Sequence, residues 1–144
     1  MKYKYDLISI GDATIDTFLM MDEKDLEVIT QDGRAKVVMN WGDKLPVSKM
    51  YRTVAGNAAN NAVGGSRLGL KTAFYTVLAH DAGGREIVHK MKKEKVAADY
   101  IVIDDRHGTN ASTVISMGGE RTILVYHQKR TYKLPELAPS RWVY

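Results

Sequence analysis

A turn of small residues followed by two amide side chains stands at Gly56, Asn57 and Asn60. Gly56 allows the backbone to approach a ligand closely, because no Cβ stands in the way. Each asparagine offers one carbonyl acceptor and two N–H donors, and a polyol requires both kinds of group. The helix that follows begins with unpaired N–H groups and a partial positive charge. The segment therefore indicates a site for a hydroxyl-rich or anionic small molecule.

Asp16 is a second candidate, because it follows the apolar run 7–10 and its closing residue Gly11. Ligands of open α/β sheets bind beyond the carboxyl ends of the strands. A carboxylate there can accept hydrogen bonds from two adjacent hydroxyls. The alternatives are that Asp16 lies in a solvated loop or caps a helix, and that Asn57 and Asn60 cap the helix that they begin.

Strands and helices that alternate along the chain must position these residues. Short apolar runs predict buried strands, and apolar residues at helical spacing predict helices, one of which contains Gly64-Gly65 and should pack closely on a neighbour. Residues 12–25 are more polar and are predicted to form a loop. The expected strands are 5–10, 72–78 and 100–103, the helices 57–68 and 83–95, and further extended pieces 36–40, 49–54, 111–117 and 122–127, the last two joined by a Gly118-Gly119 turn. This order implies a parallel or mixed α/β sheet.

The motifs resemble the first signature of the ribokinase-like (PfkB-type) carbohydrate kinases. In that family a turn of the form A/G-G-x-x-x-N opens a helix that ends in R-L-G, which here are Ala55, Gly56, Asn60 and Arg67-Leu68-Gly69. The family also begins with a strand that ends in glycine and has an aspartate five residues later, here Gly11 and Asp16. The resemblance runs from about Tyr5 to the last residue.

The resemblance implies a fold and a site. Residues 1–144 would form the N-terminal, substrate-binding half of a ribokinase-like Rossmann-type α/β domain, with a small β-sheet lid whose strands lie within 36–54 and 111–127. A sugar, sugar acid or nucleoside would be held by Asp16, Gly56, Asn57 and Asn60. Thr113 falls where a lid strand of the family faces the sugar, although threonine is also common in strands for packing reasons alone. Family lids often dimerise, so a homodimer through the lid is expected.

The part of the family that performs the chemistry is missing from the 144 residues. The family takes its proton acceptor from a G-A-G-D motif in an ATP-binding C-terminal half, and this sequence has neither. We therefore expect no catalytic or cofactor-binding residue here, with ATP and Mg²⁺ implied only for the full-length enzyme. One interpretation is a truncated kinase that is inactive alone. The alternative is a natural half-length protein, a non-catalytic sugar-binding or dimerisation module.

The amino-acid composition limits the kinds of partner, metal site and cellular location that the chain could have. The chain has a net charge of +4, 44% hydrophobic residues and no cysteine. Its basic residues are not interleaved with aromatic ones, so no nucleic-acid partner is expected. No apolar run approaches the length of a membrane span, and no histidine spacing suggests a metal site. We expect a cytoplasmic protein in which Asp81 caps the second helix and Lys129 and Arg130 lie on the surface.

Overall fold

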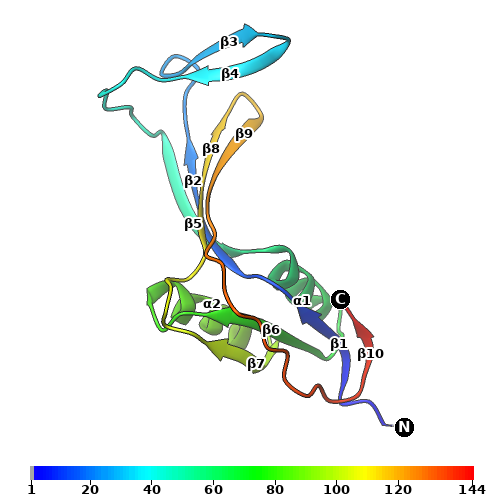
Figure 1. Cartoon of the computed structure of the whole chain (residues 1–144). Coiled ribbons are helices and arrows are strands. Elements are labelled where there is room, and N and C mark those ends of the chain that lie inside the picture. The colour runs from blue at the N-terminus through cyan, green and yellow to red at the C-terminus, as the bar shows by residue number, and fades with distance from the viewer. Residues whose placement is uncertain (1) are drawn as a thin grey trace.

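Four parallel strands form the base of the molecule in the computed structural model, which describes residues 2–144 (Figure 1). Their order is β10–β1–β6–β7, with β1 in the centre beside β6. The bounds are β1 (Tyr5–Ile10), β6 (Thr72–Leu78), β7 (Ala97–Ile103) and β10 (Ser140–Val143). The strands that the sequence predicted at 5–10, 72–78 and 100–103 are confirmed as β1, β6 and β7, although β7 begins at Ala97 and only Tyr100 of it is buried. No helix within the described residues has the length and apolar character that a membrane crossing requires.

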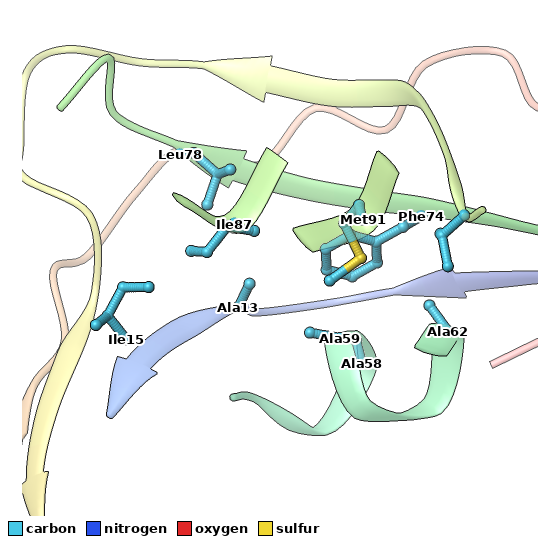
Figure 2. Packing of buried hydrophobic residues seen from close by; sticks show 10 residues of the cluster. Ala13, Ile15, Ala58, Ala59, Ala62, Phe74, Leu78, Ile87 and Met91 are labelled. Carbon is cyan, nitrogen blue, oxygen red and sulfur yellow. The ribbon is translucent and has the colours of Figure 1, made fainter. Parts of the chain in front are cut away.

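Two helices, α1 (Asn57–Arg67) and α2 (Ala82–Lys93), pack against the base sheet. Small residues of α1 bring the helix close to the larger side chains of β6 and α2, as Figure 2 shows. The core members Ala59, Ala62, Phe74, Leu78, Ile87 and Met91 are almost completely buried. A separate cluster of Tyr5, Ile8, Tyr75, Val77 and Tyr100 has Leu137 and Ala138, from the segment before β10, packed against it.

A second four-stranded sheet rises from the base and forms a lid (Figure 1). Its order is β5–β2–β8–β9, with bounds β2 (Thr14–Met20), β5 (Lys49–Ala55), β8 (Ala111–Met117) and β9 (Glu120–Tyr126). Strand β2 pairs antiparallel with β5 and parallel with β8. The predicted loop over residues 12–25 is therefore wrong, because half of it, residues 14–20, is a central lid strand. Both partners of β2 lie far from it in sequence, so no local turn signal marks the strand.

A separate two-stranded hairpin extends from the end of the lid. Strands β3 (Glu27–Gln31) and β4 (Arg34–Val38) pair antiparallel across Asp32 and Gly33, whose φ angles of 54° and 72° fit a tight hairpin turn. The extended piece predicted at 36–40 corresponds to β4, but it does not join the lid sheet. The expected hairpin over Gly118-Gly119 is confirmed, with positive φ at both glycines.

Substitution of the glycine pair in α1 tests how closely this helix packs on the base. A Cβ at Gly65 would lie 3.0 Å from Leu7 Cδ2 and from Thr72 Cγ2, whereas a Cβ at Gly64 would have no neighbour within 4 Å. We expect Gly65→Ala to lower the free energy of unfolding by about 1–2 kcal/mol. Gly64→Ala, the matched control, should raise it by about 0.5–1 kcal/mol. Urea denaturation measures both, and equal effects would contradict the close contact.

Candidate functional site

Asp16 lies on β2 at the base of the lid, with hydroxyl groups around it. Thr14 Oγ1 donates a hydrogen bond of 2.7 Å to Asp16 Oδ1. Across the sheet, Asp16 stands opposite Thr53 of β5 and Ser112 of β8. Residues that face each other across paired strands share one side of the sheet, as do residues two apart on one strand. We call this side, which carries Thr14, Asp16, Phe18, Thr53 and Ser112, the Asp16 face.

The Asp16 face has the chemistry of a site for a hydroxyl-rich ligand. One half-buried carboxylate can accept hydrogen bonds there, and three hydroxyls can donate or accept. Asp16 is neither a loop residue nor a helix cap, so the two alternatives for this residue do not hold. Above it on the same face, the rings of Phe18 and Tyr51 stack at a centroid distance of 4.7 Å. The aromatic pair closes the polar patch on the side away from the base.

Thr113 lies on the opposite side of the lid from Asp16. It stands opposite Thr17 of β2 and Leu124 of β9, one residue out of step with the Asp16 face. Its neighbour Ser112 is the residue of β8 that lies on the Asp16 face. The strand itself was predicted correctly, but a shift of one residue in register reverses every side chain.

Gly56 brings the start of α1 against the loop that follows β1. It is the N-cap residue of α1 and has a φ of 104°. A Cβ at this position would lie 2.5 Å from the carbonyl oxygen of Asp12 and 2.9 Å from Ala13 Cα. The requirement for glycine thus comes from the protein's own backbone, whereas the sequence suggested approach to a ligand.

Asn57 and Asn60 are both exposed on the first turns of α1. The cap residue is Gly56, and no side chain forms a capping hydrogen bond at this helix end, so the capping alternative does not describe Asn57. The two asparagines are three residues apart and therefore neighbours on the helix surface. Their amide groups are accessible to a ligand.

Asn60 opens onto a hollow of about 230 Å³ between α1, α2 and β5. Thr53, the strand partner of Asp16, lines the same hollow. Among the described residues the lining includes neither Asp16 nor Asn57, so the structure connects Asn60 to Asp16 only through Thr53. Arg67 and Lys90 also line the hollow, and their hydrogen bonds to Glu94, of 2.6 and 2.8 Å, hold the pKa of Glu94 at about 2. These two cations are already paired with a carboxylate.

Asp12 is a residue near the site that the sequence analysis missed. Tyr132 Oη donates a hydrogen bond of 3.0 Å to Asp12 Oδ1, and His127 Nε2 lies 3.5 Å from Oδ2. Burial raises the pKa of Tyr132, and the hydrogen bond to the Asp12 carboxylate raises it further. The contacts join the loop after β1 to the segment after β9, which are far apart in sequence. No local pattern marks such a pair.

Asp81 fixes the start of α2 and the loop before β8. Its Oδ1 accepts a hydrogen bond of 2.8 Å from the Gly84 amide, which confirms the predicted helix cap. The amide and hydroxyl of Thr109 also donate to this carboxylate, at 2.8 and 2.7 Å. Burial acts to raise the pKa of Asp81, but the hydrogen bonds outweigh it and the pKa is lowered.

Arg130 is buried, so the expectation of a surface position is wrong for this residue. Its guanidinium donates to the carbonyl oxygens of Asp104 at 3.1 Å and of His107 at 3.2 Å, and also to that of Gly108. A guanidinium carries five N–H donors and can serve several carbonyls at once. Arg130 therefore ties the segment after β9 to the loop between β7 and β8.

The comparison with known families agrees with the fold and the motifs. Residues 11–142 match the family model described as pfkB family carbohydrate kinase. This chain belongs to the pfkB family. It is 30% identical to a fructokinase of Salmonella typhimurium over 111 residues, which are 71% of this chain and 36% of the fructokinase. It is 32% identical to a 5-dehydro-2-deoxygluconokinase of Halalkalibacterium halodurans over 127 residues, which are 87% of this chain and 33% of that enzyme.

Solved structures show the same ribokinase-like α/β fold. A structure of Arabidopsis thaliana ribokinase with ribose and ATP superposes with a TM-score of 0.68 at 20% identity, covering 85% of this chain and 36% of the ribokinase. Halothermothrix orenii fructokinase gives a TM-score of 0.62 at 24% identity, with 85% and 37% covered. This pfkB chain spans about a third of the length of the relatives that it matches.

The contact of Gly56 with the Asp12 backbone predicts a large loss of stability for Gly56→Ala. Both the positive φ and the clash with a carbonyl oxygen oppose a methyl group, so we expect about 2–4 kcal/mol of destabilisation in urea denaturation. Gly42→Ala is the matched control, because Gly42 has a φ of 91° and a Cβ there would have no neighbour within 4 Å. If both variants lose the same amount, conformation alone is responsible and the contact contributes nothing.

Proposed function

We propose that this chain is the acceptor-binding part of an ATP-dependent kinase that transfers a phosphoryl group to a hydroxyl of a sugar, sugar acid or nucleoside. The observation that carries the proposal is the Asp16 face, where one carboxylate is surrounded by the hydroxyls of Thr14, Thr53 and Ser112. Membership of the pfkB carbohydrate kinases supports the same reaction class.

Each residue has a distinct role in this proposal. Asp16 accepts hydrogen bonds from two acceptor hydroxyls, and Ser112 replaces Thr113 as the contact from β8. Asn57 and Asn60 supply amide donors and acceptors from α1. Gly56 positions the start of α1 against the loop after β1. Binding that fixes the acceptor hydroxyl in place lowers the entropic part of the barrier to phosphoryl transfer.

The remaining parts of the reaction lie outside these 144 residues in our proposal. ATP and Mg²⁺, when bound by the full-length enzyme, supply the phosphoryl group and neutralise its charge. The sequence contains no G-A-G-D motif that would provide the proton acceptor. The small share of the relatives' length that the chain covers supports this division.

A homodimer through the lid is the second part of the proposal. More than half of the large apolar side chains that are exposed in the described chain belong to residues 28–51 and 123–126. Concentrated apolar surface of this kind marks interaction sites.

A cytoplasmic location is also proposed, because a chain without cysteine fits a reducing compartment.

Replacement of Asp16 tests the acceptor site. We expect one of D-ribose, D-fructose, D-gluconate or adenosine to bind the chain in an NMR titration. Asp16→Asn should raise its Kd about tenfold to a hundredfold, because hydrogen bonds to a charged acceptor contribute about 1.5–3 kcal/mol. Asp22→Asn, an exposed aspartate paired only with Lys24 among described salt bridges, is the control and should leave Kd unchanged.

Two outcomes of this titration count against the proposal. Failure of all four compounds to bind would remove the acceptor-binding function. Binding with the same Kd in wild type and Asp16→Asn, at unchanged melting temperature, would place the acceptor elsewhere on the molecule.

The division of the reaction predicts that the 144-residue chain has no kinase activity alone. We expect no release of ADP above the blank when the chain is mixed with MgATP and each of the four acceptors in a coupled assay. A complete sugar kinase in the same assay is the positive control. Acceptor-dependent ADP release by the purified chain would show that the residues needed for transfer are present here.

A further inference from the structure

No residue that the structure describes covers the side chain of Trp41. It lies in the loop between β4 and β5, and its relative exposure is 104%. An indole ring brings a large apolar area to whatever it contacts, and tryptophan is enriched among the residues that dominate binding energy at interfaces. The ring of Trp41 is therefore fully available to a partner.

An apolar groove lies at the same end of the molecule. It has a volume of about 970 Å³ and separates the β3–β4 hairpin from the tip of the β8–β9 hairpin, two segments that stand apart in Figure 1. Its walls carry the apolar side chains of Leu26, Val28, Val37, Met39, Ile115 and Leu124. Acidic and basic groups also line it, namely Glu23 and Glu120 together with Lys36 and Arg121.

We propose that this groove receives Trp41 of a second copy of the chain, and that the exchange is reciprocal. The inference rests on the lid homodimer proposed above and names the contact that would hold it. Trp41 does not fill the groove of its own chain, since it is fully exposed and is not among the groove's lining residues. The groove is therefore open to the indole of a partner.

Symmetry favours a second copy over an unrelated protein. The anchor and the groove lie on the same part of the chain, so one two-fold axis can place each Trp41 in the opposite groove. A closed dimer of this type covers both anchors and both grooves. No apolar groove is then left to extend the assembly into a fibre.

Both the loop that carries Trp41 and the groove contain acidic and basic groups. Asp43 and Lys44 lie two and three residues after Trp41 and are both exposed, so the loop that carries the indole also carries one acidic and one basic group. Asn40 Nδ2 donates a hydrogen bond of 3.0 Å to the Asp43 carboxylate. The mixed lining of Lys36, Arg121, Glu23 and Glu120 can pair with both charged groups of the loop. Complementary charges at the rim of an interface fix its register rather than its strength.

Sedimentation velocity and tryptophan fluorescence test the exchange. Trp142→Phe leaves Trp41 as the single tryptophan, because the chain has two. We expect this variant to form a dimer whose Trp41 emission shifts to the blue as concentration rises. Trp41→Ala and the groove variant Leu124→Lys should each raise the dimer Kd at least tenfold. The circular dichroism spectrum of Trp41→Ala should stay unchanged, because the exposed Trp41 makes no contact that the fold needs.

The outcomes separate the exchange from the dimer itself. A chain that stays monomeric up to about 100 μM would overturn both the lid homodimer and the exchange. A dimer that is unchanged by Trp41→Ala and by Leu124→Lys would leave the homodimer standing and overturn the exchange. A monomer whose groove binds 1-anilinonaphthalene-8-sulfonate, with binding lost in Leu124→Lys, would show that the groove takes a small apolar ligand instead.

Discussion

The close approach of Gly56 to the backbone of Asp12 and Ala13 is the constraint on which the arrangement of lid and base depends. A Cβ at Gly56 would lie 2.5 Å from the Asp12 carbonyl oxygen, so only glycine allows the contact as it stands. It joins two of the segments that pass between the layers, the one from β1 to β2 and the one from β5 to α1. Strand β2, which carries Asp16, and helix α1, which carries the two asparagines, both begin next to this contact.

Polar contacts tie the other crossing segments to the same region. Asp12 binds Tyr132 from the segment after β9, and Arg130 of that segment donates to the loop between β7 and β8. That loop is held in turn by Asp81 through Thr109. The lid is therefore fixed at its base by backbone packing and side-chain hydrogen bonds, while its far end carries exposed apolar surface. The two ends suit different tasks, recognition of a small molecule and contact with another chain.

The sequence predicted those parts of the fold that have a local signal. The fully buried strand β6 and the helix α1 follow from a continuous apolar run and from helical spacing, and Asp81 followed from helix capping. Strand β2 was missed because its seven residues alternate weakly and pair only with distant strands. Thr113 and Ser112 could not be told apart, because register decides which one faces Asp16. Asp12 and Arg130 depend on contacts between loops that only the folded chain brings together.

The parallel pairing of β2 with β8 has a consequence for folding. Strands β8 and β9 are neighbours in sequence, and β2 and β5 enclose only residues 21–48 with their hairpin, but β2 reaches β8 across the 90 residues 21–110, which also include both helices and the base strands β6 and β7. Pairings between distant segments require a long loop to close and therefore form slowly. We therefore expect the pairs β2–β5 and β8–β9 to form first as separate two-stranded ribbons. The β2–β8 pairing that joins them should form late, once the base sheet has brought the two ribbons together.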